Sequence, residues 1–243
     1  MSTRESPYEI DPDSGLPIGP VIRRSQPAQP PGHVVLEGRY VRLEPLDASR
    51  HGDDLFAAST PPDASRRFRY LPDAAPTNRA AYQPWLDNAA NSTDPMFWAV
   101  IDRLTGRAEG RQSYLRITPN HQSIEIGNIY WGPAIAGTRI ATEANYLFAC
   151  HAFDVLGYRR YEWKCDSLNA ASRRAAERFG FSFEGIFRRH FIIRGRSRDT
   201  AWFAMVEDDW PDIKAAYERW LDPENFDTNG HQRRHLAEWM PKA

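Results

Sequence analysis

W-G-P-A-I-A-G-T-R-I-A-T-E-A, residues 131–144, is the stretch that decides the fold. The residues before it, 123–131, are rich in β-branched and aromatic side chains, which predicts a strand. After it, apolar residues recur at helical spacing from Ile140 to Val155, until Gly157. In a strand, glycine loop and helix arranged in this order, the free N–H groups of the loop and the first helical turn converge. Because the helix dipole also favours negative charge there, we expect a phosphate to bind at this point.

Three common motifs do not fit this stretch. Gly132 and Gly137 have the spacing of a P-loop, but Thr138-Arg139 occupies the place where that motif needs Lys and Ser or Thr. The chain also contains neither G-x-G-x-x-G nor G-x-S-x-G. The sequence therefore disfavours nucleotide hydrolysis, dinucleotide binding and serine hydrolase chemistry.

The residues that follow are more specific. A strand is expected at residues 160–166, and then a helix that begins at Asn169 with N-x-x-S and ends at Gly180-Phe181. This order resembles the GNAT acetyltransferases, most closely their ribosomal-protein (RimJ/RimL-like) branch, over about residues 36–210. The resemblance implies an α+β fold with a mixed, mainly antiparallel sheet of about seven strands flanked by helices. A parallel pair of strands would surround an acetyl-CoA cleft.

The resemblance also implies which residues hold acetyl-CoA, used as a co-substrate. These are Ile129, Trp131, Ala136, Gly137, Thr138, Arg139, Ile140, Ala141, Asn169 and Arg174. One position departs from the family loop Q/R-x-x-G-x-G/A, because Arg139 fills the second small position and Ala134 the leading polar one. Arg139 either crowds the pyrophosphate or adds a charge-assisted contact to it, and we expect the contact. The alternative is a loop that has lost cofactor binding.

The composition limits which partners and which cellular compartment the sequence predicts. The chain has 243 residues, of which 41% are hydrophobic and 26% charged, and a formal net charge of −1. We expect no nucleic-acid partner and no membrane partner, because there is neither a global basic excess nor an apolar run long enough to cross a bilayer. Two cysteines without C-x-x-C spacing indicate reduced thiols in a cytoplasmic protein. His231 and His235 are four residues apart but lack the other features of a zinc motif, so no metal is expected.

The order of elements predicts one domain with extensions. Residues 1–32 are rich in proline and predict an extended arm; the domain covers residues 33–221, and 222–243 form a polar tail. The other strands are expected at residues 34–46 (two short runs), 96–101, 112–117, 187–193 and 201–206. The other helices are expected at residues 48–60, 78–91, 139–156 and 208–221. Because helix 139–156 crosses over between strands 123–131 and 160–166, we expect that pair to be parallel. A homodimer remains open.

Acetyl transfer to an amine requires a group or water relay that removes the amine proton and a donor that protonates the leaving thiolate. The resemblance implies that Glu125 is the base, usually through water. An alternative of equal weight is an exposed strand carboxylate paired with Arg116. Alternation along the strand places Ile124, Ile126 and Asn128 on the opposite, core-facing side.

The proton donor is also assigned by resemblance. From the sequence alone Asn169 is a helix N-cap, and Ser172 is an incidental polar residue in the first turn. The family adds that Asn169 contacts the pantetheine arm and that Ser172 or a bound water protonates the coenzyme A thiolate. Tyr130 or Tyr161 could replace Ser172 in that role.

The acceptor amine is the least specified element. Trp85, Trp98 and Tyr130 are candidates for its wall, although aromatic residues on regular elements usually form the core. The segments expected to border it carry mostly arginines: Arg66, Arg67, Arg69, Arg194, Arg196 and Arg198. Such a rim would repel polyamines and favour an amino acid or a peptide N-terminus. A non-catalytic acyl-CoA-binding or partner-binding relative is the alternative function.

Overall fold

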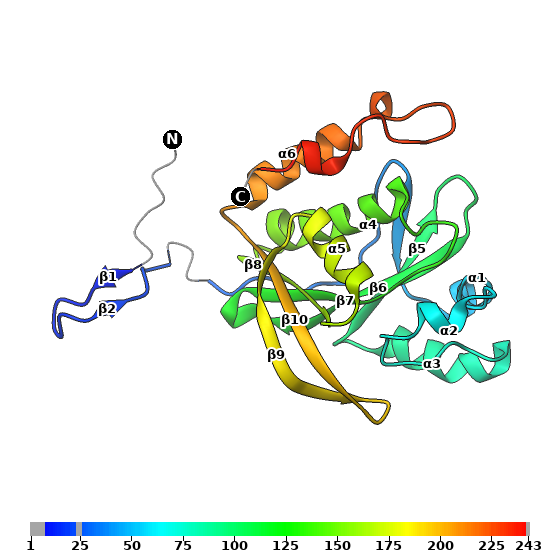
Figure 1. Cartoon of the computed structure of the whole chain (residues 1–243), viewed down its shortest axis with the longest axis horizontal. Helices are drawn as coiled ribbons and strands as arrows, with labels where there is room; N and C mark the ends of the chain where they lie inside the picture. The colour runs from blue at the N-terminus through cyan, green and yellow to red at the C-terminus, as the bar shows by residue number, and fades with distance from the viewer. Residues whose placement is uncertain (1–7, 23–25, 242–243) are drawn as a thin grey trace.

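The computed structural model describes residues 8–22 and 26–241, and its centre is one eight-stranded sheet (Figure 1). The sheet has the order β3-β4-β5-β6-β7-β8-β10-β9, so it has one strand more than the expected seven. All neighbours are antiparallel except β7 and β8, which are parallel as predicted. The strands are β3 (Leu36–Glu37), β4 (Val41–Pro45), β5 (Met96–Asp102), β6 (Ala108–Thr118), β7 (Ser123–Trp131), β8 (Arg160–Asp166), β9 (Ser182–Ile193) and β10 (Arg196–Val206).

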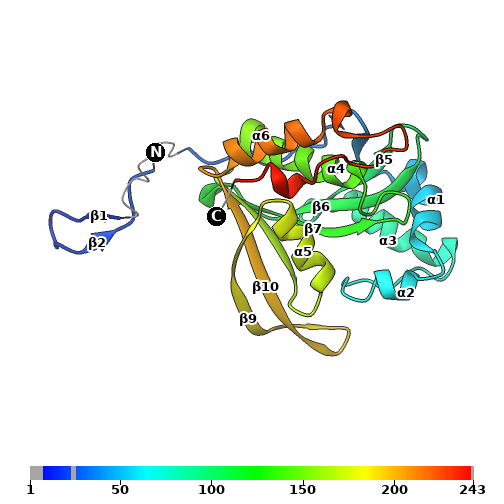
Figure 2. The same ribbon diagram turned by 45° about the horizontal axis from the view of Figure 1, so that its top comes forward.

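Six α-helices lie in the described ranges and cover the two faces of this sheet. They are α1 (Ala48–Ser59), α2 (Ala64–Arg67), α3 (Arg79–Asn91), α4 (Arg139–Cys150), α5 (Ala170–Arg178) and α6 (Trp210–Trp220). Figures 1 and 2 show α4 and α5 against one face, with α6 packed outside α4, whereas α1 and α3 cover the other face over β5 and β6. The main core therefore lies between the sheet and α4, and a smaller one lies beneath α1 and α3.

Side-chain caps explain where the helices begin. Asp47 accepts the N–H groups of the first turn of α1, and Asn78 accepts the N–H of Ala81 in α3. Thr138 caps α4 and Asn169 caps α5 in the same way. The predicted helix 139–156 is α4 followed by a single π-helical stretch, His151–Val155. The last third of the predicted helix is therefore helical as expected, but its turn is wider than that of an α-helix.

A buried glutamate attaches α4 to the first strands of the sheet. Glu143 is 4% exposed, and its carboxylate accepts the backbone N–H groups of Arg39, Tyr40 and Val41 at 2.6–2.8 Å. A side chain at Gly38 would collide with this carboxylate, because a Cβ there would lie 2.6 Å from the Glu143 carboxyl carbon. The contact fixes the first turn of α4 against the β3–β4 hairpin.

The parallel pair separates halfway along its length. β7 and β8 are paired only from Ser123 to Ile126 on one strand and from Arg160 to Trp163 on the other. On its other side β7 contains a bulge, since Gly127 pairs with Ser113 but Tyr130 pairs with Arg111. The two features open the sheet next to the loop that leads to α4.

The bulge corrects one expectation about side-chain direction. Ile124 and Ile126 are buried in the main core as predicted. Asn128, however, has a left-handed backbone with φ of 50°, and its side chain donates a hydrogen bond to the Ser113 hydroxyl at 3.0 Å. Alternation fails at Asn128 because the extra residue of the bulge interrupts it.

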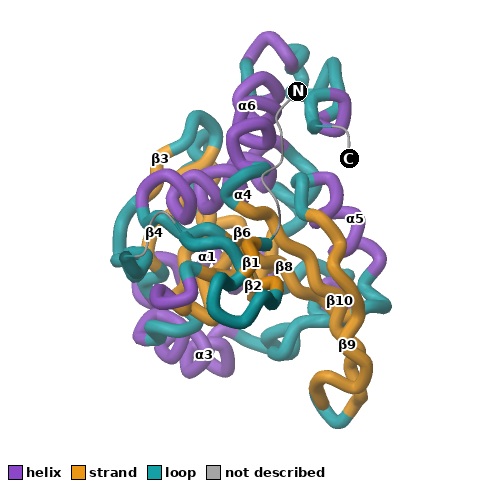
Figure 3. The backbone as a smooth tube through the Cα atoms, turned by 90° about the vertical axis from the view of Figure 1, so that its left-hand side faces the viewer, coloured by secondary structure: helices purple, strands orange, loops and turns teal. Residues whose placement is uncertain are grey.

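Segments on both sides of the predicted domain, within the described ranges, contact it. In the N-terminal arm, β1 (Glu9–Ile10) and β2 (Pro17–Ile18) form an exposed hairpin that projects toward the viewer in Figure 3. Ala28, by contrast, is buried, and its N–H donates to the Pro119 carbonyl. The C-terminal residues expected as a polar tail contain the short 3₁₀ helices η3 (Pro223–Asn225) and η4 (Leu236–Glu238), with another, η1 (Pro119–His121), before β7. Phe226 and Leu236 are buried in the main core, so this segment packs against the domain.

The described residues contain no helix that is long and apolar enough to cross a membrane.

Candidate active site

A cavity of about 1100 Å³ lies where β7 and β8 separate. Its wall includes the second half of β7, the end of β8, the first turn of α5 and the segment 63–72 after α1. Two contacts close it on the side of this segment: the Tyr70 hydroxyl donates to the Leu168 carbonyl, and Arg194 donates to the carbonyls of Phe68 and Arg69. The cavity is therefore bounded by the sheet, by α5 and by the tip of the β9–β10 hairpin.

The loop before α4 presents unpaired N–H groups. Gly137 has a φ of 77°, and a Cβ at this position would meet no atom within 4 Å, so the glycine is needed for its backbone conformation and faces open space. Among the described residues, no acceptor binds the N–H groups of Gly137, Arg139 and Ala141, whereas that of Ile140 donates to the Thr138 hydroxyl. Such donors at a helix N-terminus fit a phosphate group.

The structure divides the ten residues expected to hold acetyl-CoA into two groups. Those in the cavity wall are Ile129, Trp131, Ala136, Asn169 and Arg174. Gly137, Thr138, Arg139, Ile140 and Ala141 form the end of the loop and the first turn of α4 and are not part of that wall. A ligand that reached both groups would be long, as a nucleotide joined to a thiol-bearing arm is.

Arg139 does not lie where we expected it. Its guanidinium carbon is 4.2 Å from the centre of the Tyr40 ring and 5.1 Å from that of Phe226, on the side of α4 that faces the C-terminal segment. Two aromatic rings thus provide a cation–π site for the side chain. Neither the crowding nor the anion contact expected from the sequence is needed to explain its presence in the loop.

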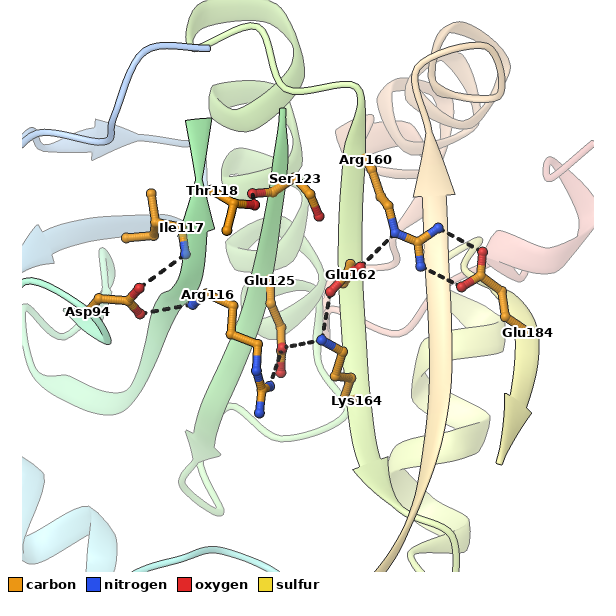
Figure 4. Close-up of polar contacts among 10 residues, drawn as sticks. All are labelled: Asp94, Arg116, Ile117, Thr118, Ser123, Glu125, Arg160, Glu162, Lys164 and Glu184. Carbon is orange, nitrogen blue, oxygen red and sulfur yellow. Dashed lines mark hydrogen bonds and ion pairs between the residues drawn. The ribbon is translucent and has the colours of Figure 1, made fainter. Parts of the chain in front are cut away.

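Glu125 belongs to a row of alternating charges whose residues come from four strands, β6, β7, β8 and β9 (Figure 4). Its Oε2 atom accepts from Arg116 Nη1 at 2.6 Å and lies 3.0 Å from Lys164 Nζ. Lys164 also contacts Glu162 at 2.7 Å, and Arg160 joins Glu162 to Glu184 on β9. The expected partner Arg116 is therefore confirmed, but the carboxylate is 3% exposed and does not lie on an open surface.

The two oxygens of Glu125 differ in their surroundings. Oε2 binds both cations, whereas Oε1 accepts no hydrogen bond from a described residue and lies on the side of Gly127, 3.5 Å from where a Cβ there would be. Burial raises the pKa of Glu125, while Lys164 and Arg116 lower it in part. A cavity-lining carboxylate with one free oxygen and a raised pKa has the properties of a general base.

Ser172 and Asn169 lie together at the start of α5. The Asn169 side chain accepts the Ser172 N–H at 3.1 Å, which confirms the predicted N-cap. The Ser172 hydroxyl accepts the indole N–H of Trp163 at 3.0 Å. Since the indole uses an oxygen lone pair, the hydroxyl can still donate its proton, and its possible acceptors are the Cys165 thiol and a ligand in the cavity that both Ser172 and Trp163 line.

The tyrosines are poorly placed to act as proton donors. Tyr130 lines the cavity, but its hydroxyl donates to the Ala58 carbonyl at 2.6 Å, and burial raises its pKa to about 12. Tyr161 is fully buried among Phe153 and Phe181, and burial raises its pKa well above the usual value. Ser172 is therefore better placed than either.

Two of the three residues expected at the acceptor do not line the main cavity. Trp98 is fully buried, contacts Tyr114 and Phe148 in the main core and donates its indole N–H to the Val34 carbonyl. Its assignment to a substrate wall is wrong, because β5 turns this side chain toward α4. Trp85 lies on α3 and lines a second cavity instead of the first. Tyr130 alone contributes to the main wall.

The arginine rim is only partly free. Arg66, Arg67, Arg69 and Arg198 line the cavity, and Arg194 and Arg196 do not. Arg67 is paired with Asp63 at 2.9 Å. Fewer arginines than expected therefore face the cavity, since Arg194 binds backbone carbonyls.

Lys164 and Trp163 were not identified from the sequence. Lys164 is only 3% exposed at its side chain and lies 3.7 Å from the centre of the Trp202 ring. The sequence offered a signal, because Arg160, Glu162 and Lys164 alternate on one face of a strand whose other face is apolar. Charged side chains buried on one face of a sheet need oppositely charged partners, and here Glu125 in the candidate site is one of them.

No cluster of three or more potential metal-ligating side chains occurs within the described ranges. The ring of His231 contacts Asp227 at 3.3 Å.

Comparison with protein families now identifies this architecture. The family model described as "Acetyltransferase (GNAT) domain" matches residues 41–182, a span that contains the parallel pair, the loop and α5. The chain belongs to the GNAT acetyltransferase family. It is thus assigned to the acyltransferases, and enzymes of this family use acetyl-CoA as the acetyl donor.

Solved GNAT structures agree with this assignment. A GCN5-related N-acetyltransferase from Brucella melitensis is 55% identical, covers 90% of this chain and 99% of its own, and has a TM-score of 0.88. A GNAT-family protein from Chromobacterium violaceum is 37% identical, with 81% and 98% covered and a TM-score of 0.75. The fold also matches a Salmonella typhimurium acetyl transferase that modifies the N-terminal serine of ribosomal protein L7/L12, at 18% identity, 71% and 99% coverage and a TM-score of 0.61. No curated protein matches the chain significantly.

Proposed function

We propose that this GNAT protein transfers the acetyl group of acetyl-CoA directly to a primary amine in a ternary complex. The observation that carries the proposal is that a free carboxylate oxygen of Glu125 and the hydroxyl of Ser172 belong to one cavity, beside the unpaired N–H groups of the loop. Acetyl-CoA supplies the acetyl group and leaves as a thiol. The sequence resemblance to the RimJ/RimL-like branch supports an amino acid, a peptide N-terminus or a small amine as acceptor, in a cytoplasmic protein.

The two residues handle protons at opposite ends of the reaction. Glu125 receives the proton that the amine releases as its nitrogen bonds to the acetyl carbon, through one water where the distance requires it. Ser172 passes a proton to the thiolate sulfur as the carbon–sulfur bond breaks, and a water molecule returns a proton to its hydroxyl. Asn169 keeps the first turn of α5 in place, because its side chain binds the Ser172 N–H.

Direct transfer is supported by the thiol in the cavity wall. Cys165 lines the cavity but is 5% exposed, and burial raises its pKa. A thiol that resists ionisation is a poor nucleophile, so the residue does not favour an acetyl-enzyme intermediate.

The first expected result concerns the donor. Acetyl-CoA at a hundred times its Kd should stabilise the protein by about 2.7 kcal/mol, because it binds only the folded chain. Calorimetry gives the Kd, and thermal unfolding gives the stabilisation. A thiol-release assay over amino acids, peptides and small amines then tests transfer. Donor binding without thiol release from any amine would instead support a non-catalytic acyl-CoA-binding relative.

A second expected result concerns Arg139. Because its guanidinium lies over Tyr40 and Phe226, Arg139→Gln should lower the free energy of unfolding by about 1–2 kcal/mol. The acetyl-CoA Kd should change less than threefold, since the contact is not with the anion. Urea unfolding and calorimetry measure the two quantities on one sample, with Arg219→Gln on α6 as the control. An affinity loss above tenfold with unchanged stability would place Arg139 at the phosphates after all.

A further inference from the structure

A second cavity of about 410 Å³ adjoins the first. Pro72 and Asn128 line both cavities, so the two meet at the β7 bulge. The wall of the second cavity combines aromatic side chains of α3 and β5 with an arginine of β6, Arg111. None of the reactions assigned above uses this space.

Arg111 is the unusual member of that wall. It is 1% exposed, although arginine is almost never fully buried without ample pairing. Its guanidinium carbon lies 3.8 Å from the centre of the Trp85 ring and 6.0 Å from that of Phe97. These aromatic contacts hold the plane of the guanidinium in one orientation.

The hydrogen bonds of Arg111 are incomplete. A guanidinium has five N–H donors, and the only one with an acceptor among the described residues is on Nη2, bound to Asp73 Oδ2 at 2.5 Å. The Nε atom is buried and unpaired. Leaving a buried donor without an acceptor costs about 1–3 kcal/mol, so an acceptor is missing that a ligand could supply.

We propose that Arg111 binds the carboxylate of the acceptor, and that the acceptor is a free amino acid or a similar amine bearing a carboxylate. The proposal rests on the proposed acetyltransferase function. Arginine is suited to this ligand because its planar fork matches a carboxylate. Polyamines, aminoglycosides and simple alkylamines lack the carboxylate that Arg111 would bind.

The spacing of the strands agrees with such a ligand. The cleft opens at Gly127, which pairs with Ser113, and Arg111 is two residues further along the same face of β6. Two residues of a strand span roughly 7 Å. An amino acid with its amine at the cleft opening can place its carboxylate within hydrogen-bonding reach of Arg111.

Asp73 competes with this ligand. Its carboxylate lies in the wall of the second cavity and already occupies one edge of the guanidinium. The ion pair keeps Arg111 neutralised in the absence of acceptor, and an incoming carboxylate must share or replace that partner. Removal of the Asp73 charge should therefore favour acceptors that carry a carboxylate and leave uncharged ones unaffected.

The decisive measurement is the NMR resonance of the Arg111 Nε–H group, assigned by its loss in Arg111→Lys. The protein, saturated with coenzyme A, is titrated with each standard amino acid and with the matching carboxamide. We expect at least one amino acid to shift this resonance while its carboxamide does not, and Asp73→Asn to strengthen that binding severalfold. The proposal would be overturned if no amino acid shifted the resonance, or if the carboxamides shifted it equally.

Kinetics with the responding amino acid separate this inference from the proposed function. Arg111→Lys should raise the KM for the amino acid by about 10- to 100-fold and change kcat little, because it removes a charge-assisted contact that positions the substrate. The KM for the carboxamide should stay within threefold. A shifted resonance without thiol release would refute acetyl transfer but keep the carboxylate site. Thiol release with amines that leave Arg111 unaffected would refute the site and keep the enzyme.

Discussion

Glu125→Gln should lower kcat by about 10²–10⁴-fold while leaving the acetyl-CoA Kd within threefold of the wild-type value. The amide cannot accept the proton of the amine, yet it has nearly the same shape. Lys164 retains Glu162 as a partner and Arg116 is partly exposed, so the fold should survive. The matched control is Glu162→Gln, which alters the same row of charges and should change kcat less than tenfold.

The pH profile gives the same test a second readout. Burial raises the pKa of Glu125 above its usual value, so the carboxylate required as base is lost at a higher pH than for an exposed glutamate. In the wild type kcat should therefore fall as the pH decreases through that raised pKa. In Glu125→Gln this acidic limb should disappear. If Glu125→Gln kept both the wild-type kcat and its decrease at low pH, another group would be the general base.

Glu143→Ala should lower the free energy of unfolding by about 3–5 kcal/mol, because several buried N–H groups lose their acceptor at once. The change removes a buried carboxylate and leaves the N–H groups of Arg39, Tyr40 and Val41 without their acceptor. Urea unfolding measures the loss, and Tm should fall by roughly 10 °C.

Two companion variants establish the cause of that loss. Glu143→Gln keeps one carbonyl oxygen and should recover part of the stability. Glu177→Ala removes an exposed glutamate of α5 and should stay within about 0.5 kcal/mol of the wild type. A loss in Glu143→Ala no larger than in Glu177→Ala would show that the three hydrogen bonds contribute nothing.

The fold was predictable because local and periodic signals agree along most of the chain. Strand 123–131, strand 160–166 and the N-cap Asn169 appear in the structure where the sequence places them. Strand periodicity also fixed the buried side of β7 up to Ile126. These features depend on residues close together in sequence, so one chain suffices to read them.

The site was harder to predict because it depends on contacts between distant segments. The bulge at Asn128 changes which way side chains point, and no composition signal marks it. Arg139 turns to rings from residues 40 and 226, and Trp98 faces the core, although both had been assigned to ligands. Arg111 was not considered, since its partners Asp73 and Trp85 lie far from it in the sequence.

The packing of Phe226 against Arg139 and the core has a consequence for biosynthesis. Arg139 stands at the first turn of α4, and one of the two rings beside it, that of Phe226, comes from a segment much later in the chain. The surroundings of the start of α4 are therefore completed only after residue 226 has been synthesised. A nascent chain that stops near residue 221 would carry every residue of the proposed chemistry and still lack the segment that encloses the start of this helix.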